Sequence, residues 1–223
     1  MSPIQIIDVR QNILEANDKI ANDTRQMLRE KKIFLLNLQS SPGAGKTRLL
    51  TATINALKNE FVIGVMEAAI DSDVDARRIA DTGVRVVQLH TGNLGHMDAS
   101  MTQQGLASLD LNGLDLIVLE DIGNLVGPME FDTGASKTAV ILSVGEGDDK
   151  PLKYPLLFGH ADIVLVNKVD VIEYFDFDFD KVIRNIHLRR PGIPVLPVSA
   201  RTGAGIDVWT GWLRNEIMEW KKN

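Results

Sequence analysis

Short apolar runs rich in β-branched residues alternate with longer, helix-compatible segments from Ile33 onward. This alternation predicts a parallel sheet covered on both faces, because parallel strands need crossover connections long enough for a helix. We therefore expect an α/β protein with three layers and a mainly parallel sheet of about seven strands. The expected strands are residues 33–39, 61–66, 84–89, 114–119, 137–144, 163–167 and 194–198.

Both ends of the chain carry helical patterns. In the first thirty residues, apolar side chains such as Ile13, Ile20 and Leu28 recur at roughly helical spacing among charged ones. This N-terminal helical extension, residues 1–30, is either an outer helix packed on the domain or an arm that meets a partner. Residues 206–222 should form a closing helix. Neither a repeat nor a linker divides the sequence, so we expect a single domain over residues 1–223.

The composition excludes several classes of site. The chain has 223 residues, no cysteine and a net charge of −6. Disulfides, thiolate zinc sites, iron–sulfur clusters and a cysteine nucleophile are therefore excluded. An acidic chain without a basic run is a poor candidate for nucleic-acid binding. Neither a secretory signal nor an apolar run near the roughly 20 residues that span a bilayer is visible, so we expect a cytoplasmic protein without a membrane partner.

Residues 40–47, Ser-Ser-Pro-Gly-Ala-Gly-Lys-Thr, lie between an expected strand and a helical segment. They match the phosphate-binding pattern G-x-x-x-x-G-K-[ST], except that Ser40 replaces the first glycine and would be strained if that position needed a positive φ. Glycines let backbone N–H groups curl around an anion, and the helix N-terminus adds its positive end. We expect Lys46 to reach the β- and γ-phosphates and the Thr47 hydroxyl to ligate Mg²⁺. The alternative is an ordinary glycine-rich turn without a ligand. If the loop binds a nucleotide, the residues expected to contact it are Gly43, Ala44, Gly45, Lys46, Thr47 and Arg48.

A second motif follows a later strand and predicts guanine recognition. Asn167, Lys168 and Asp170 form the tetrapeptide pattern N-K-x-D. An aspartate can accept hydrogen bonds from both N1–H and the amino group of guanine, whereas adenine has no donor at N1. The Lys168 stem can cover the base, and Asn167 can bond the base edge or the phosphate loop. After the last strand, Ser199 and Ala200 resemble the loop that completes a guanine pocket, with the Ala200 N–H aimed at the base oxygen.

Three longer stretches are typical of one protein family: residues 91–99 (TGNLGHMDA), 120–128 (EDIGNLVGP) and 146–155 (EGDDKPLKYP). With the two nucleotide motifs, they make the chain resemble the HypB family over about residues 30 to 215. HypB proteins are GTPases that assist nickel insertion during hydrogenase maturation. The resemblance implies a P-loop NTPase fold of the dimer-forming branch, with GTP or GDP and Mg²⁺ as ligands. The implied partners are a second copy of the chain, a HypA-like protein and the hydrogenase large subunit.

The resemblance also implies roles for individual residues. Glu120 should be a metal- or water-facing acid, and Asp75, in the switch segment, should support Mg²⁺ or the attacking water. Gly123 should sense the γ-phosphate, and Lys153 should reach toward the partner's nucleotide. For each charged side chain the alternative is a solvated surface group. The implied catalytic residues are thus Lys46, Asp75 and Glu120, and the implied Mg²⁺ ligands are Thr47, Asp75 and Glu120.

The chain departs from the family where metal chemistry is concerned. The family pattern has cysteines where this chain has Gly95 and Gly127, so only His96 remains as a transition-metal ligand, and soft thiolates are missing. Ala69 also stands where the family has an acid near the nucleotide metal. Nickel or zinc binding therefore stays open. Besides a nickel-inserting GTPase, a hydrolytically weak GTP-binding scaffold or a chaperone for another metallocofactor fits the sequence.

Overall fold

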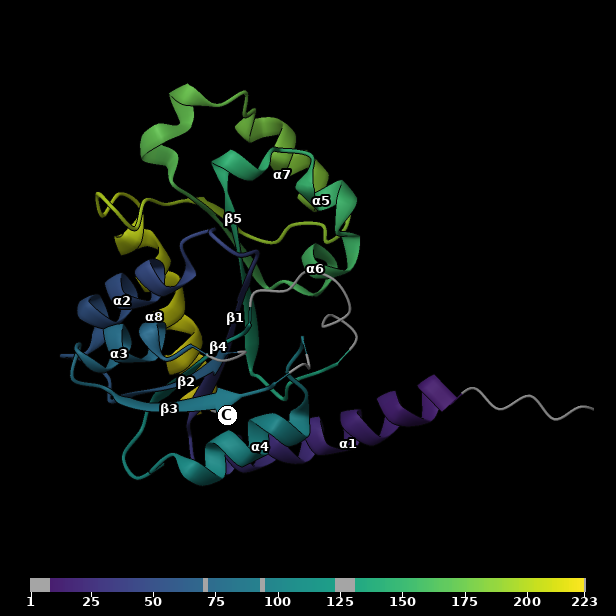
Figure 1. Ribbon diagram of the computed structural model, residues 1–223, viewed down its shortest axis with the longest axis vertical. Helices are drawn as coiled ribbons and strands as arrows, with labels where there is room; N and C mark the ends of the chain where they lie inside the picture. The colour runs from purple at the N-terminus through teal and green to yellow at the C-terminus, as the bar shows by residue number, and fades with distance from the viewer. Residues whose placement is uncertain (1–8, 70–71, 93–94, 123–130, 223) are drawn as a thin grey trace, which may run out of the picture.

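A single parallel sheet organises the chain (Figure 1). The computed structural model describes residues 9–69, 72–92, 95–122 and 131–222. Its seven strands follow the order β3-β2-β4-β1-β5-β6-β7, and every neighbouring pair is parallel. The expected fold class is confirmed. The strands are β1 (Phe34–Ser40), β2 (Ile63–Ala69), β3 (Arg85–His90), β4 (Leu116–Glu120), β5 (Lys137–Ser143), β6 (Ile163–Asn167) and β7 (Val195–Pro197).

Helices cover both faces of this sheet and complete three layers. On one face, α2 and α8 pack on the buried side chains Phe34, Leu36 and Leu38 of β1, and α3 packs on β2 and β3. The opposite face is covered by α1 near β1, by α4 near β2 and β3, and by α6 and α7 near β5 and β6. The helices are α1 (Val9–Glu30), α2 (Lys46–Leu57), α3 (Val74–Ala80), α4 (Ala99–Ser108), α5 (Lys150–Lys153), α6 (Pro155–His160), α7 (Phe179–His187) and α8 (Ile206–Lys222).

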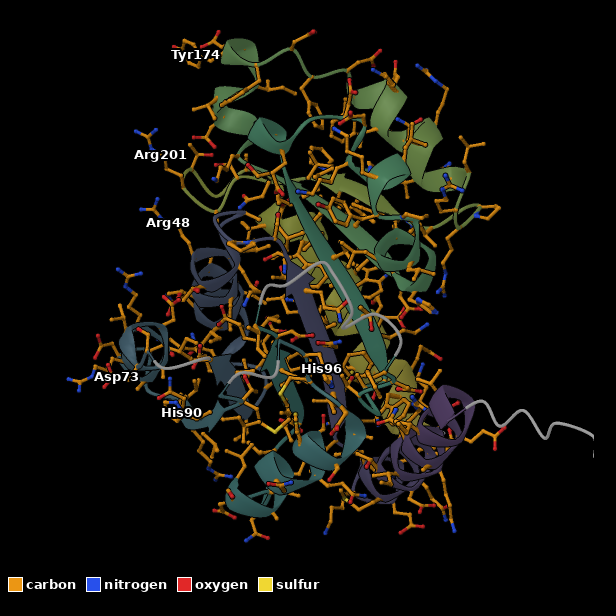
Figure 2. All side chains as sticks on the ribbon, turned by 45° about the vertical axis from the view of Figure 1, so that its right-hand side comes forward. Arg48, Asp73, His90, His96, Tyr174 and Arg201 are labelled. Atoms are coloured by element: carbon orange, nitrogen blue, oxygen red, sulfur yellow. The ribbon has the colours of Figure 1, made fainter. Side chains whose placement is uncertain are left out.

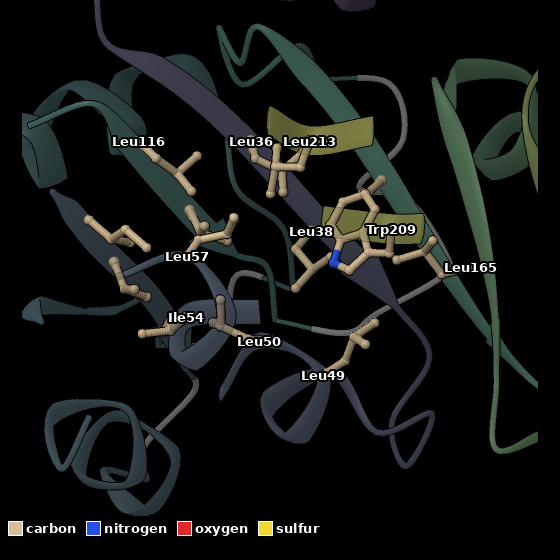
Figure 3. Packing of buried hydrophobic residues seen from close by; sticks show 14 of the residues in the cluster. Leu36, Leu38, Leu49, Leu50, Ile54, Leu57, Leu116, Leu165, Trp209 and Leu213 are labelled. Carbon is tan, nitrogen blue, oxygen red and sulfur yellow. The ribbon is translucent and has the colours of Figure 1, made fainter. Parts of the chain in front are cut away.

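Helix α2 begins at the phosphate loop and is held firmly by the core (Figure 3). Its buried residues include Leu50 and Ile54, which lie in the same apolar cluster as Trp209 and Leu213 of α8. Trp209 is fully buried, and its indole N–H donates to Thr53 Oγ1 at 2.8 Å. A buried indole with a hydrogen-bond partner combines apolar packing with a fixed direction. The clamp between α8 and α2 therefore gives the phosphate loop a rigid base.

Helix α1 shows how the N-terminal extension relates to the rest of the chain. Its residues Ala21 and Leu28 are fully buried. Asn17 bridges two segments, because its amide donates to the Asp132 carbonyl at 2.8 Å and accepts from the Ala99 N–H at 3.0 Å. The described part of the extension is therefore a packed outer helix. Residues 1–8 lie outside the described part of the chain.

Candidate nucleotide site

The phosphate loop joins the end of β1 to the start of α2, as the sequence pattern predicts. Gly43 and Gly45 have φ values of 78° and 95°, in the region that favours glycine. A Cβ added to Gly45 would lie 2.6 Å from Asn167 Nδ2, so this position has no room for a side chain. Ser40 is the last residue of β1 and is not among the described residues with positive φ. The strain considered for Ser40 is thus absent.

Two residues of the loop, Lys46 and Thr47, meet an acid at the end of β4. The Thr47 hydroxyl donates to Glu120 Oε1 at 2.8 Å, and Lys46 Nζ lies 3.3 Å from the same oxygen. Lys46 also donates to the main-chain carbonyl of Asp121. Glu120 is buried, and its other oxygen, Oε2, has no hydrogen-bond partner among the described residues. A hydroxyl beside a carboxylate with an unused oxygen is chemistry that suits Mg²⁺, which prefers hard oxygen ligands and retains several waters.

A second buried acid, Glu67, lies beside Glu120. The parallel register of β2 and β4 pairs the two residues directly. The pKa of Glu67 is raised to about 7, first by burial and second by the charge of Glu120. The Gln88 amide donates to Glu67 Oε2 at 2.9 Å, which favours the ionised form and partly offsets the rise. The sequence analysis noted that Ala69 replaces an acid and gave Glu67 no role. Glu67 could have been found as the acid that follows the expected second strand.

The guanine motif and the phosphate loop are tied together by side chains. Asn167 Nδ2 donates to the Ala44 carbonyl at 2.8 Å, and Asn167 Oδ1 accepts from the Ala200 N–H at 3.1 Å. Lys168, at a left-handed φ of 66°, donates to the Gly43 carbonyl at 2.6 Å. Of the two functions considered for Asn167, the structure has the bond to the phosphate loop. The loops that carry the two motifs are therefore positioned by one another.

Asp170, the residue expected to read the base, is oriented by the last loop. Ser199 Oγ donates to Asp170 Oδ1 at 2.6 Å. The guanidinium of Arg201 lies 3.8 Å from Asp170 Oδ2 and is itself largely exposed. Ser199 is fully buried and also accepts from the N–H of Thr202 at 3.1 Å. Because its Ser199 partner is fixed, the carboxylate of Asp170 has a defined direction before any ligand binds.

Three of the expected site residues, Asp75, Lys153 and Arg48, do not join the cluster that Lys46 and Thr47 form with the two buried acids. Asp75, on α3, pairs with Arg78 at 3.2 Å, although its charge still raises the pKa of Glu67. Lys153 pairs with Asp149 at 2.6 Å. The side chain of Arg48 is exposed, and Figure 2 shows it projecting into solvent on the same side of the molecule as Arg201. Within this chain, the cluster of Lys46, Thr47, Glu67 and Glu120 forms without them.

Comparisons with known proteins identify the family. Residues 34–197 match the family model described as CobW/HypB/UreG, nucleotide-binding domain. The chain is 43% identical over 216 residues to the hydrogenase maturation factor HypB of Azotobacter vinelandii, covering 97% of this chain and 71% of that protein. The chain belongs to the HypB family. The HypB of Escherichia coli K12 is 39% identical over 216 residues, covering 97% of this HypB-family chain and 74% of the relative.

Solved structures agree with the family assignment. HypB from Helicobacter pylori, crystallised in complex with nickel, has a TM-score of 0.87 and 33% identity and covers 92% of this chain and 96% of that one. HypB from Archaeoglobus fulgidus has a TM-score of 0.84 and 32% identity, with 91% and 99% coverage. The signal recognition particle receptor FtsY of Elizabethkingia anophelis, at 14% identity and a TM-score of 0.55, shares the fold only. In the described part of this HypB-family chain, every helix is too short or too polar to cross a membrane.

The metal-binding positions of the HypB pattern are altered here. The His96 ring stacks on Phe131 with centroids 4.7 Å apart. Burial raises the pKa of Asp121, and the hydrogen bond from Gln39 partly offsets the rise. His90, Met97 and Met129 are the side chains near His96 in the sequence that could replace the missing thiolates. His90 lies at the exposed end of β3, apart from His96 in Figure 2, and Met97 is buried in the apolar core. Gly123, Gly127 and Met129 lie outside the described residues. No group of three or more histidine, aspartate or glutamate side chains suited to a metal gathers in the part of the chain that is described.

Proposed function

We propose that this chain binds GTP and GDP with Mg²⁺ and hydrolyses GTP in support of nickel insertion during hydrogenase maturation. The observation that carries the proposal is the mutual positioning of the two nucleotide motifs: Asn167 and Lys168 bond the carbonyls of the phosphate loop, and Ser199 orients Asp170. A ligand that satisfies both motifs must carry phosphates and a base with adjacent donors. Guanine nucleotides meet that requirement.

The proposed mechanism assigns each residue a charge or an orientation. Lys46 would leave its bond to the Asp121 carbonyl and stabilise charge on the β- and γ-phosphates. Thr47 and Glu120 would hold Mg²⁺, which supplies positive charge at the phosphate oxygens. Glu67, beside Glu120, would keep a negative field at this position, and Asp75 would orient the attacking water if the α3 segment closed on the nucleotide. Catalysis of this kind depends on positioning and electrostatics rather than on covalent chemistry.

Nucleotide titration tests this function directly. Fluorescent GDP, GTP and ADP should each be titrated into the purified chain, once with Mg²⁺ and once with EDTA. Unlabelled GDP and ADP should then be used to displace the bound fluorescent nucleotide. We expect guanine nucleotides to bind more than a hundredfold better than ADP, because adenine would leave Asp170 without a partner. Equal affinity for ADP, or no binding of GDP, would refute the proposal. Size analysis of the same samples tests whether GTP promotes the expected homodimer.

A second candidate is a GTP-binding scaffold with weak hydrolysis and no metal site of its own. Two sequence observations favour it: the chain lacks cysteine, and Ala69 replaces an acid of the family pattern. Single-turnover hydrolysis separates the two candidates, since a scaffold retains affinity but shows a rate near background. Titration with Ni²⁺ and Zn²⁺, with and without GTP, tests the metal question. Co-purification tests the proposed partners. A HypA-like protein or a hydrogenase large subunit among the bound proteins supports nickel insertion, whereas an enzyme with another metallocofactor supports a chaperone for that cofactor.

A further inference from the structure

One carboxylate of the 146–155 stretch, Glu146, has no part in the mechanism above, yet it touches the phosphate loop. Its Oε1 accepts a hydrogen bond from the Ser41 hydroxyl of that loop and from Lys150 Nζ at 2.9 Å. Its Oε2 accepts from the Ser143 N–H at 2.8 Å. The side chains of Glu146 and Lys150 are only 16% and 17% exposed. Three donors from three segments thus converge on one partly buried carboxylate.

The charge balance of this group indicates positioning rather than direct binding. A lone carboxylate behind a phosphate loop would repel the ligand that the loop is built to hold. Lys150 neutralises Glu146 and also lies 5.0 Å from the centre of the Tyr154 ring, which holds the ammonium in place. What remains is a strong, directional acceptor for Ser41, because hydrogen bonds to ionised groups are stronger than neutral ones.

The same group connects the phosphate loop to two other parts of the molecule. Glu146 ends the 3₁₀ turn η2 (Val144–Glu146), and Lys150 begins α5. In η2, a Cβ added to Gly145 would lie 3.2 Å from the ring of Phe175. Phe175 immediately follows the 3₁₀ segment η3 (Val169–Tyr174), which contains Asp170. A shift of Ser41 on nucleotide binding would therefore be felt by α5 on one side and by the base-reading segment on the other.

We propose that Glu146 is a positioning residue that holds the phosphate loop through Ser41 and couples nucleotide binding to α5. This inference rests on the proposed function, because it needs a nucleotide in the loop. The competing explanation is local: Ser143 and Glu146 form a capping box for η2, which would stabilise the turn without affecting the loop. The two explanations differ in their effect on nucleotide affinity and on α5.

The test uses charge-balanced variants of the full chain. Ser41→Ala removes the hydroxyl, Ser41→Thr keeps it, and Glu146→Gln/Lys150→Met removes both charges while preserving side-chain length. The matched control is Asp148→Asn/Lys181→Met, an ion pair of 2.8 Å that joins the same stretch to α7 and, in the described part of the chain, makes no hydrogen bond to the phosphate loop. Circular dichroism and thermal unfolding establish that each variant folds. GDP affinity and amide exchange of residues 146–155, with and without GDP, are then measured.

We expect Ser41→Ala and Glu146→Gln/Lys150→Met each to weaken GDP binding about tenfold to a hundredfold, the effect of losing one charge-assisted hydrogen bond. The triple variant Ser41→Ala/Glu146→Gln/Lys150→Met should be no weaker than the poorer of the two, because both changes act on the bond between Ser41 and Glu146: one removes the donor and the other removes the charge of the acceptor. Ser41→Thr and the control pair should stay within about twofold of the parent. GDP should slow amide exchange in α5 of the parent but not of Glu146→Gln/Lys150→Met.

Several results would overturn the inference. Unchanged GDP affinity in both Ser41→Ala and the charge-balanced pair, or losses that multiply in the triple variant, would leave Glu146 as a local cap only. If the charge-balanced pair fails to fold, Ser41→Ala against Ser41→Thr still decides the question. A parent chain that binds no GDP would refute the proposed function and this inference together, whereas a parent that binds GDP with unaffected variants refutes this inference alone.

Discussion

The two adjacent acids, Glu67 and Glu120, make the stability of the ligand-free chain depend on pH in a predictable way. The pKa of Glu67 is raised from its usual 4.5 to about 7, chiefly by burial. The folded protein therefore holds a proton that the unfolded chain releases, and the free energy of unfolding falls as the pH rises from about 4.5 to 7. At 1.36 kcal/mol per pH unit, a rise of this size corresponds to up to about 3 kcal/mol.

Replacing Glu67 by glutamine should remove this pH dependence. Urea unfolding in EDTA, without nucleotide, should find Glu67→Gln up to about 3 kcal/mol more stable than the parent at pH 8 and nearly equal to it at pH 5. The difference between the two proteins cancels the titration of carboxylates that do not interact with Glu67. Adding Mg²⁺ and GDP should shrink the difference at pH 8, because the cation neutralises the acid pair. Glu173→Gln, at an exposed position, is the control. Parallel pH profiles for parent and Glu67→Gln would refute the reasoning.

Three further substitutions have defined outcomes. Asp170→Asn should weaken GDP binding by about a hundredfold or more and favour xanthosine diphosphate, whose carbonyl accepts from the new amide; competition titration checks both. Gly45→Ala should lower the free energy of unfolding by about 1–3 kcal/mol in denaturant titrations and abolish GDP binding, because Gly45 has a φ of 95° and no room for a Cβ. The control Gly211→Ala, in an open stretch of α8, should be neutral or stabilising. Trp209→Phe should cost about 2–3 kcal/mol, measured in the same way, through lost volume and the lost bond to Thr53; a change below 1 kcal/mol would contradict the clamp.

Much of the fold could be predicted from local pattern, because the buried strands are short apolar runs with turn residues between them. Strand β6 (Ile163–Asn167) and helix α8 (Ile206–Lys222) have the expected bounds. Strand β2 is the informative miss: it was expected to end at Met66 and continues to Ala69. The expected strand was placed where the apolar run ends, so the charged residue at position 67 was left outside it. The same residue, Glu67, is the acid that sequence reasoning left without a role.

The remaining parts of the site depend on contacts that no local pattern encodes. The pairing of Glu67 with Glu120 follows from β4 lying beside β2, and strand order is not written in either segment. The bond from Asn167 to Ala44 joins residues 123 positions apart. By contrast, the pairs of Asp75 with Arg78 and of Lys153 with Asp149 have three- and four-residue spacings, which the sequence could have indicated. Motifs therefore predicted which residues matter better than they predicted how those residues meet.

The strand order has a consequence for biosynthesis. Strand β1, which carries the phosphate loop, has β4 and β5 as its neighbours, and these strands end at Glu120 and Ser143. A nascent polypeptide that has emerged only as far as β3 exposes a phosphate loop with neither neighbour in place. Glu120, which faces Thr47, is the last residue of β4, and Asp170, which is proposed to select the base, emerges only after β5. If the chain binds guanine nucleotides as proposed, the ligand could bind only after most of the chain has been synthesised and could not assist the early stages of folding on the ribosome.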